Sequence, residues 1–297
     1  MNLNHLAIFH AVAEEGTISK GAERLHISQP AVSKQLAEFE RALGTPLFDR
    51  LPKGVRLTES GRLLHLYARR LFALETEAER ALRELRGLER GRLALGASTS
   101  IGPYLLPSVL ARFHRAHPGV EVYLEISNTE AIQKAVEEGG IDLGFTEGFL
   151  HSPHLEARVF LEDELVPIVA PGYDLPLKDE ALTLARLCRE PFVVREPGSG
   201  TREVIEEALR SRGLSVHPAM TLGNTEAIKR AVAEGVGVAI VSRLTIQEEE
   251  RDGQLVVLRV ADFTLRRPLH QLQVHGHQAS ASVRAFLTLF RASLQTR

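Results

Sequence analysis

An internal repeat limits how this chain can fold more than any other feature of its sequence. Residues 128–145 read NTEAIQKAVEEGGIDLGF and residues 224–241 read NTEAIKRAVAEGVGVAIV, and nine of the eighteen positions are identical. Each copy has the pattern of a capped amphipathic helix, a glycine turn and a short apolar strand. Two amphipathic helices can resemble each other by chance, but here the first five positions match in a row. We therefore predict two similar α/β lobes.

Strands and helices alternate around the first copy of the repeat. The pattern predicts strands at 92–96, 120–127 and 141–145, separated by helices at 103–117 and 129–138. This βαβαβ order is typical of an α/β domain with a largely parallel sheet. Ligands of such domains bind at the carboxyl ends of the strands.

Four polar segments follow predicted strands and open predicted helices. Helix N-termini present free N–H groups and the positive end of the helix dipole, which suit carboxylate, sulfate and phosphate groups. Each hydroxyl or amide can instead simply cap its own helix. Because four such segments converge between two lobes, we predict a binding site for a small anionic effector. Its candidate residues are Ser98, Thr99, Ser100, Asn128, Thr129, Ser199, Gly200, Thr201, Arg202, Asn224 and Thr225.

The composition excludes several classes of protein. The single cysteine, Cys188, excludes an intramolecular disulfide framework and a multi-cysteine metal site. The chain has no apolar run of 18 residues, and Met1 to Phe9 lack the basic and apolar pattern of a secretory signal. We therefore expect a cytoplasmic protein that does not contact the membrane.

Charge is distributed unevenly along the chain. Residues 1–70 carry ten Lys or Arg and seven Asp or Glu, whereas the remaining 227 residues carry 26 basic and 31 acidic ones. A basic segment attached to an acidic body favours local contact with a polyanion. Ordinary variation in surface charge is the alternative.

Three short helices are predicted in the basic segment. Gly16 ends the first, a tight turn at 26–27 follows the second at 18–25, and Ser28 is the expected N-cap of the third. This spacing matches a helix-turn-helix, whose second helix enters the DNA major groove. A three-helix bundle with a solvated basic face is the alternative. The residues of the third helix expected to face the core are Ala31, Val32, Leu36, Phe39 and Leu43.

The DNA contacts are expected on the third helix and on the hairpin that follows it. Gln bonds adenine bidentately, and Ser or Lys contacts bases or phosphates. The hairpin turns at 52–54 and would hold the DNA backbone, with Arg50 able to reach the minor groove. The candidate DNA-binding residues are Ser28, Gln29, Pro30, Ser33, Lys34, Gln35, Arg50, Lys53 and Arg56.

A heptad pattern follows the hairpin. Its apolar positions are Leu64, Tyr67, Leu71, Leu74, Ala78, Ala81, Leu85 and Leu88. Such a seam predicts a long helix that pairs with the same helix of a second chain. A helix packed on its own domain is the alternative.

The segment from Phe9 to Gly61 closely resembles the N-terminal winged helix-turn-helix of LysR-type transcriptional regulators. The matching features are S-Q-P-A-V-S at 28–33, L-G-x-x-L-F-x-R at 43–50 and L-T-x-x-G at 57–61. One departure is Ile18 before Ser19, where many relatives have an aromatic residue. The length and the C-terminal organisation agree, so the resemblance covers the whole chain.

The resemblance implies an α plus α/β architecture in three parts. Residues 1–58 would form the winged helix-turn-helix, 59–90 the linker helix, and 91–297 an effector domain with the type 2 periplasmic-binding fold. Lobe I would comprise about 91–162 and 269–297, and lobe II about 163–268. The implied partners are double-stranded operator DNA, RNA polymerase, a small-molecule effector, and further copies of the chain as dimers that commonly form tetramers. The R-E-x-G-S-G-T-R stretch at 195–202 occurs in family members linked to sulfur or carbon assimilation.

The sequence shows no catalytic set and predicts no cofactor or metal. The pairs His114 and His117, His151 and His154, and His275 and His277 lack a third ligand at suitable spacing. Cys188 is expected to be an inert core thiol, and residues 162–164 a solvated acidic run. An enzyme or a transport receptor on the same two-lobed fold, and a nucleoid protein, are the alternatives to a regulator. An enzyme would need acid–base or nucleophilic groups in the cleft, whereas only hydroxyls, Asn and Arg are evident there.

Overall fold

The computed structural model describes residues 2–84, 91–175, 181–276 and 278–295. Internal contacts divide the chain into two units, Met1–Arg80 and Ala81–Arg297. Within the described ranges, no helix is long and apolar enough to cross a membrane.

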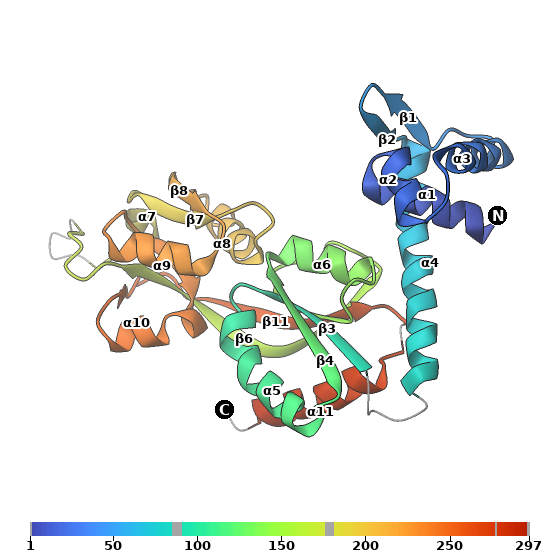
Figure 1. Ribbon diagram of the computed structural model, residues 1–297. Coiled ribbons are helices and arrows are strands. Elements are labelled where there is room, and N and C mark those ends of the chain that lie inside the picture. Colours follow the sequence, from blue (N-terminus) through green and yellow to red (C-terminus); the bar gives the residue numbers. More distant parts are fainter. Residues whose placement is uncertain (1, 85–90, 176–180, 277, 296–297) are drawn as a thin grey trace. The chain divides into compact units, whose positions relative to one another are not determined.

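The first unit is a small helical bundle with a hairpin (Figure 1). Its core is formed by apolar side chains from all three N-terminal helices, including the fully buried Phe9 and Val32. The hairpin strands pair in antiparallel register, with Asp49 opposite Arg56. The elements are α1 (Leu3–Glu15), α2 (Ile18–Arg24), α3 (Gln29–Leu43), β1 (Phe48–Leu51), β2 (Gly54–Leu57) and α4 (Glu59–Glu84), which continues to the unit boundary and beyond it.

Local sequence explains where these helices begin and end. Gly16 adopts a left-handed conformation (φ +68°) and closes α1, and the Thr17 side chain accepts a hydrogen bond from the Lys20 N–H to cap α2. A Cβ at Gly21 would lie 2.6 Å from a methyl carbon of Val12, so glycine allows α1 and α2 to approach closely. Ser28 stands at the N-cap of α3, but its side chain makes no capping hydrogen bond.

Three of the five residues predicted on the inward face of α3 are buried, while Ala31 is half-buried. Val32, Leu36 and Phe39 are buried, whereas Leu43 is 38% exposed. The expectation for Leu43 was wrong because Gly44 ends the helix there, so the last turn projects beyond the bundle core.

The second unit contains both copies of the repeat in two α/β lobes. The first lobe contains β3 (Gly91–Ser98), α5 (Gly102–Ala116), β4 (Val120–Ser127), α6 (Thr129–Glu137), β5 (Leu143–Glu147) and α11 (Ala281–Leu294). The second contains α7 (Leu184–Leu187), β7 (Phe192–Arg195), α8 (Gly200–Arg210), β8 (Pro218–Leu222), α9 (Thr225–Ala233), β9 (Ala239–Ser242), the 3-10 turn Arg243–Thr245, α10 (Gln247–Arg251) and β10 (Val256–Val257). The predicted two-lobed α/β architecture is confirmed.

Two long strands connect the lobes (Figure 1). β6 (Leu155–Val169) and β11 (Leu265–Val274) pair antiparallel from Leu155 opposite Val274 to Leu165 opposite Leu265. Beyond Leu165, β6 pairs with β9 and β10 of the second lobe. β11 also pairs with β5 of the first lobe.

The sheet is mixed, and the expectation of a largely parallel sheet was wrong. Its order is β10-β6-β11-β5-β3-β4, with β9 also on β6. Within this order, only β3 is parallel to its neighbours β4 and β5. β7 and β8 form a separate parallel pair. The antiparallel contacts arise because the two connecting strands run through the sheet in opposite directions, which a reading of successive βα units does not reveal.

Helices cover both faces of the first lobe's sheet. α5 and α11 pack on one face around Phe113 and Phe286, and α6 packs on the other through Ile132 and Val136. The two copies of the repeat form equivalent structures, with Asn128 capping α6 and Asn224 capping α9. Both helices therefore begin at the boundary between the lobes.

Candidate nucleic-acid interface and effector cleft

The amphipathic helix α3 presents most of its predicted DNA-binding residues to solvent. Ser28, Gln29, Pro30 and Lys34 are exposed, while Ser33 and Gln35 are half-buried. The Gln29 side chain accepts a hydrogen bond of 3.2 Å from the Ser19 hydroxyl on α2. The buried face of α3 leaves this N-terminal surface free of core contacts, as a recognition helix requires.

The hairpin carries the three predicted basic residues on its surface. Arg50, Lys53 and Arg56 are all exposed. Arg56 forms an ion pair of 3.2 Å with Asp49 on the opposite strand, whereas Lys53 lies in the turn. An exposed pair of this kind contributes little to folding, so Arg56 can exchange its carboxylate partner for a phosphate at low cost.

The helix α4 has two apolar faces with different environments. Leu64, Ala68 and Phe72 pack into the core of the first unit. This face of the helix therefore packs on its own domain, as the alternative to pairing between chains expects. A second stripe, formed by Leu63, Tyr67, Leu71 and Leu74, is 38–59% exposed. The prediction that Leu64 belongs to the pairing seam was therefore wrong, because its side chain packs into the core of the first unit. Leu85 and Leu88 lie outside the described residues.

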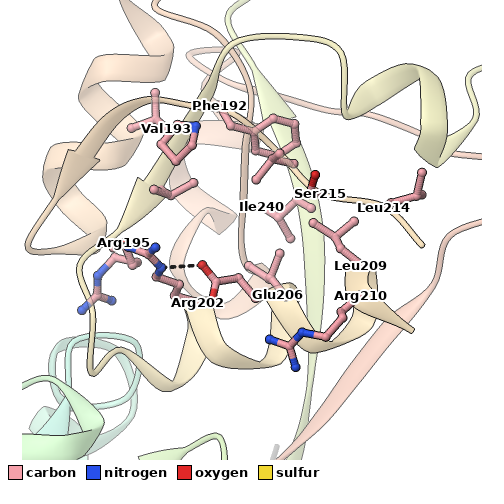
Figure 2. Close-up of a pocket in the computed structure, with 14 residues that line it drawn as sticks. Phe192, Val193, Arg195, Arg202, Glu206, Leu209, Arg210, Leu214, Ser215 and Ile240 are labelled. Carbon is pink, nitrogen blue, oxygen red and sulfur yellow. Dashed lines mark hydrogen bonds and ion pairs between the residues drawn. The ribbon is translucent and has the colours of Figure 1, made fainter. Parts of the chain in front are cut away.

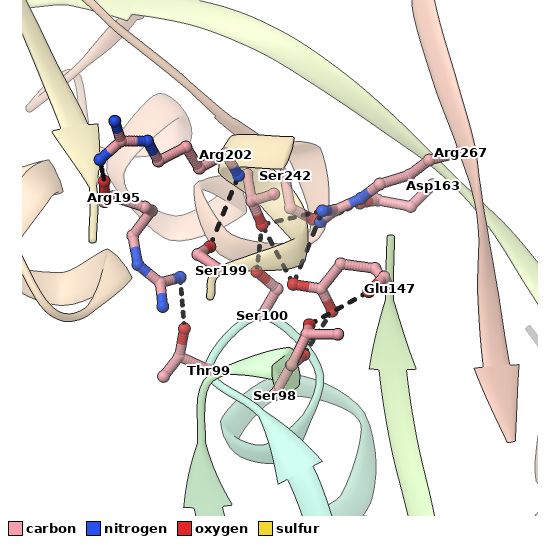
Figure 3. Close-up of polar contacts among 12 residues, drawn as sticks. Ser98, Thr99, Ser100, Glu147, Asp163, Arg195, Ser199, Arg202, Ser242 and Arg267 are labelled. Carbon is pink, nitrogen blue, oxygen red and sulfur yellow. Dashed lines mark hydrogen bonds and ion pairs between the residues drawn. The ribbon is translucent and has the colours of Figure 1, made fainter. Parts of the chain in front are cut away.

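Hydroxyl groups from the two lobes meet at their boundary (Figure 3). Thr99 and Thr225 approach to 3.4 Å between their Oγ1 atoms, and Ser100 Oγ lies 3.4 Å from Thr201 Oγ1. Ser100, Thr201 and Thr225 are buried. The structure thus brings together one predicted segment after β3 and the N-termini of α8 and α9.

Arg195 supplies a positive charge at this boundary that the sequence analysis did not single out. It is 5% exposed and donates to Thr99 Oγ1 at 2.7 Å and to Thr225 Oγ1 at 3.5 Å. Two further hydrogen bonds of 2.8 Å hold its guanidinium on Glu196. Its position at the end of β7, just before the predicted loop, was the signal that could have identified it.

Arg202 points elsewhere. Its guanidinium bonds Glu206 on the same helix at 2.7 Å (Figure 2) and the Arg195 carbonyl at 3.0 Å (Figure 3). It lines a different cavity of about 360 Å³ in the second lobe, between α8 and β7 (Figure 2). The floor of that cavity is apolar, with Phe192, Leu209 and Ile240 among its lining residues.

Several predicted site residues use their polar groups within the fold. Asn128, Asn224 and Ser199 each cap their own helix. Thr129 donates to the Glu147 carbonyl at 3.1 Å. A Cβ at Gly200 would lie 2.2 Å from the same carbonyl oxygen, so only glycine permits this contact between the lobes.

A buried cluster of charges lies next to the hydroxyl pairs. Arg267, on the connecting strand β11, is 1% exposed and bonds Asp163 on β6 at 2.9 Å and Thr201 at 2.8 Å. Glu147 accepts from Thr201 at 3.0 Å and from Ser98. Burial raises the pKa of Asp163, although the charge of Arg267 and the hydrogen bond from Ser242 oppose the rise.

This cluster corrects two expectations. Asp163 is 3% exposed, so the run at 162–164 is not uniformly solvated. The alternation of side chains along β6 turns its middle carboxylate inward between two outward ones. The boundary also contains the carboxylates Glu147 and Asp163, in addition to the hydroxyls, Asn and Arg evident from the sequence.

A second polar contact joins the lobes beside the hydroxyl pairs. Tyr104 on α5 donates to Glu226 on α9, and Lys229 on α9 donates to the Tyr104 oxygen at 3.0 Å. Burial and the Glu226 carboxylate raise the pKa of Tyr104 to about 12. Lys229 also bonds Glu249 at 2.6 Å. We call Tyr104, Glu226 and Lys229 the lobe clasp.

The remaining reactive side chains have the environments expected of structural residues. Cys188 is 8% exposed, and burial raises the pKa of its thiol. His151 lies 2.9 Å from a Glu203 oxygen, and His114 is near the end of α5. His275 follows β11 rather than lying within it, and His277 lies outside the described residues.

A helix-turn-helix unit joined to a two-lobed α/β domain defines the class of ligand-responsive transcriptional regulators. Comparison with known families agrees: residues 3–62 match the bacterial regulatory helix-turn-helix protein of the lysR family, and residues 86–295 match the LysR substrate binding domain. The chain belongs to the LysR family of transcriptional regulators, as the sequence motifs predicted.

Similar proteins match either nearly the whole chain or its effector domain alone. The RuBisCO operon transcriptional regulator of Allochromatium vinosum is 36% identical over 96% of this chain and 94% of its own length. The regulatory domain of Synechocystis PCC6803 CcmR, solved in complex with 2-PG, is 30% identical and covers 69% of this chain and 98% of its own, with a TM-score of 0.64. Full-length CbnR with its target DNA shares the fold at 24% identity, covering 99% and 100%, with a TM-score of 0.66.

Proposed function

We propose that this regulator binds operator DNA through α3 and the hairpin, and that a small anion held between the lobes controls its activity. Residues 1–58 form the DNA-binding part, 59–90 the linker helix and 91–297 the effector part of this proposal. The exposed polar surface of α3 beside the basic hairpin carries the DNA assignment. The proposed major-groove contacts come from residues 28–30 and 33–35, among which Lys34 contacts a phosphate. Arg50, Lys53 and Arg56 would contact phosphates or the minor groove.

The anionic effector is supported by the charge and dipoles at the lobe boundary. Arg195 lies beside Thr99 and Thr225, and α8 and α9 direct their N-termini toward the same region. The similarity to a protein named as a transcriptional regulator favours ligand sensing over catalysis. The 2-PG (2-phosphoglycolate) bound to the CcmR domain supports a small phosphorylated carboxylic acid as the effector class. The similarity to a RuBisCO operon regulator supports the carbon-assimilation branch of the family.

Binding at this boundary would change how the lobes meet. The hydroxyl pairs are in contact at 3.4 Å, so a ligand inserted between them must separate them and replace their hydrogen bonds. The ligand thereby favours one arrangement of the lobes over another. Through dimers paired along α4, and tetramers built from them, such a change would alter the spacing of two recognition helices and the DNA bend offered to RNA polymerase.

Fluorescence anisotropy against the DNA upstream of the chain's own gene tests the DNA assignment. The titration is run at two salt concentrations with scrambled DNA of equal length as competitor. Lys34→Ala should weaken binding and reduce the salt slope by about 0.9 because one phosphate contact is lost. Lys134→Ala, an exposed lysine on α6, is the matched control and should change neither. An unchanged slope for Lys34→Ala would contradict its phosphate role.

Thermal unfolding with 2-PG, sulfate or inorganic phosphate tests the effector assignment. A ligand that binds the folded state raises its melting temperature. Thr99→Ala and Arg195→Met should each remove this rise while leaving DNA affinity without ligand unchanged. Thr288→Ala, an exposed threonine on α11, should respond like the parent. A normal response in both cleft variants would show that the site lies elsewhere.

A further inference from the structure

Three potential metal ligands meet inside the DNA-binding unit. His10 and Glu14 lie one helical turn apart on α1, and His65 lies on α4. One ligand atom from each residue lies within 4.8 Å of the other two. His65 Nε2 is 3.0 Å from Glu14 Oε1. The three side chains thus bridge the first helix and the linker helix.

The surroundings of His10 leave one imidazole nitrogen available to a metal ion. Its ring lies between His65 and Phe72, at centroid distances of 5.2 Å from each. Its Nδ1 atom is buried, and within the described part of the chain it has no hydrogen-bond partner.

We propose that His10, Glu14 and His65 bind one Zn²⁺ ion that links α1 to α4. Two imidazoles and one carboxylate are a known ligand set for zinc, with water in the fourth position. Tetrahedral coordination with zinc–nitrogen and zinc–oxygen bonds of about 2.0–2.1 Å places the ligand atoms about 3.3 Å apart. The three ligand atoms therefore need to approach one another by only about an ångström. Cys188 is buried in the other unit and cannot compete as a ligand at this position.

Arg69 determines which metals this site accepts. Its Nε and Nη2 atoms donate to Glu14 Oε1 at 2.9 and 2.7 Å. These bonds orient the carboxylate as an outer-shell partner does in metal proteins. The guanidinium charge repels any cation. The site should therefore exclude Mg²⁺ and Ca²⁺, which depend on several oxygen ligands, and accept an ion with strong affinity for imidazole.

The metal would stabilise the junction between the DNA-binding helices and the helix that carries the exposed Leu63, Tyr67, Leu71 and Leu74 stripe. α4 already packs on α1 through Leu64, Ala68 and Phe72, and His65 and Arg69 are the polar residues between those positions. A bond from α1 to α4 would restrict the angle at which the recognition unit leaves the linker helix. Bound zinc would therefore affect the spacing of two recognition helices in an oligomer.

Isothermal titration and thermal unfolding of the full chain test the proposal. After treatment with a chelator and its removal, the protein is titrated with ZnCl₂ and, separately, MgCl₂. We expect one Zn²⁺ per chain, a rise in melting temperature with zinc, and no binding of Mg²⁺. His10→Gln, Glu14→Gln and His65→Gln should each weaken zinc binding at least tenfold and abolish the rise. His114→Gln, which alters an exposed histidine in the other unit, should leave both unchanged.

Variant folding is checked by circular dichroism without metal. If His10→Gln disturbs the core, Glu14→Gln still tests zinc binding. Glu14 is exposed, and glutamine preserves the shape of its side chain. Zinc binding that persists unchanged in Glu14→Gln and His65→Gln, or no zinc binding by the parent, would overturn the proposal.

Discussion

Arg267 shows how a single residue is committed to the contact between the lobes. It is among the largest fully buried side chains, and it satisfies Asp163 and Thr201 while lying 3.6 Å from Glu147. The surrounding carboxylates belong to β5 and β6, so the cluster forms only when the connecting strands are in register. A buried charge without its partner is costly, which makes this residue a structural requirement.

Replacement of Arg267 by methionine should destabilise the effector unit strongly. Loss of the guanidinium leaves Asp163 and Glu147 buried without a cation, which costs about 3–5 kcal/mol. Urea unfolding of the full chain measures the free energy of unfolding. Arg158→Met, which removes an exposed ion pair with Glu156, should cost under about 1 kcal/mol. Equal losses of unfolding free energy in the two variants would show that the buried cluster contributes no more to stability than an exposed ion pair.

His270 should make the effector unit sensitive to mild acid. It lies on β11 opposite Thr146, and burial lowers its pKa from 6.5 despite the nearby charge of Glu147. Since the pKa is lower in the folded state than in the unfolded state, the neutral form favours folding. This stabilisation is complete above pH 6.5 and is lost as the pH falls through the lowered folded pKa.

The test of His270 is the pH dependence of thermal unfolding. The melting temperature of the parent should fall between neutral pH and about pH 5. His270→Gln should flatten this fall, because glutamine does not titrate. A variant that follows the parent curve over the whole range would assign the acid sensitivity to other groups.

At the scale of elements, α4 has one apolar face that packs in the DNA-binding unit and another that is exposed. The heptad pattern in the sequence does not distinguish these two faces. The face at Leu64, Ala68 and Phe72 belongs to the DNA-binding unit, and the other stripe, at Leu63, Tyr67, Leu71 and Leu74, is exposed. Exposed apolar stripes of this extent on a helix are typical of interaction sites. The stripe fits the pairing of linker helices proposed for this regulator.

A charge in the exposed stripe should separate the paired chains. Leu74 is 56% exposed, so Leu74→Asp should leave the fold of the single chain intact and disfavour its burial in a dimer. Sedimentation velocity should show more monomer, with a rise of at least tenfold in the dissociation constant of the dimer. Leu51→Asp, at an exposed leucine of the hairpin, should not change the oligomeric state. An unchanged dimer with Leu74→Asp would place the interface on another surface.

At the scale of the whole effector unit, two of the sets of side-chain contacts that join the lobes lie beside the proposed effector site. One set consists of the central hydroxyl pairs with Arg195, and the other is the lobe clasp of Tyr104, Glu226 and Lys229. Both sets connect α5 or the end of β3 with helix N-termini of the second lobe. We therefore expect ligand binding at the proposed site and the contact between the lobes to be coupled.

Tyr104→Phe should strengthen effector binding without touching the proposed effector site. The change removes a hydroxyl that bonds Glu226 and Lys229, and charge-assisted bonds contribute about 1.5–3 kcal/mol. Because a ligand has to separate the hydroxyl pairs, a weaker contact between the lobes lowers the cost of this separation, and the Kd for 2-PG should fall about tenfold. Calorimetry measures this Kd, with Tyr123→Phe, at an exposed tyrosine of β4, as control. An unchanged Kd would exclude a role for the lobe clasp in closure.

The elements around the first copy of the repeat, several helix ends and the two repeated halves followed from the sequence alone, because caps, glycines and apolar spacing act over a few residues. Asn128, Asn224 and Thr17 cap the helices that their positions predicted. The family was also recognisable from local motifs, since the α3 and hairpin residues lie close together in the chain.

Only the tertiary structure decided which polar residues share a site. Arg195 reaches Thr99 across 96 positions, Arg267 meets Asp163 across 104, and His65 approaches Glu14 from another helix. Sequence spacing carries no information on such encounters, because strand crossing and helix packing determine them. The same reason explains why the sheet proved mixed and why Asp163 is buried: both depend on the two connecting strands, which pair only after the lobes assemble.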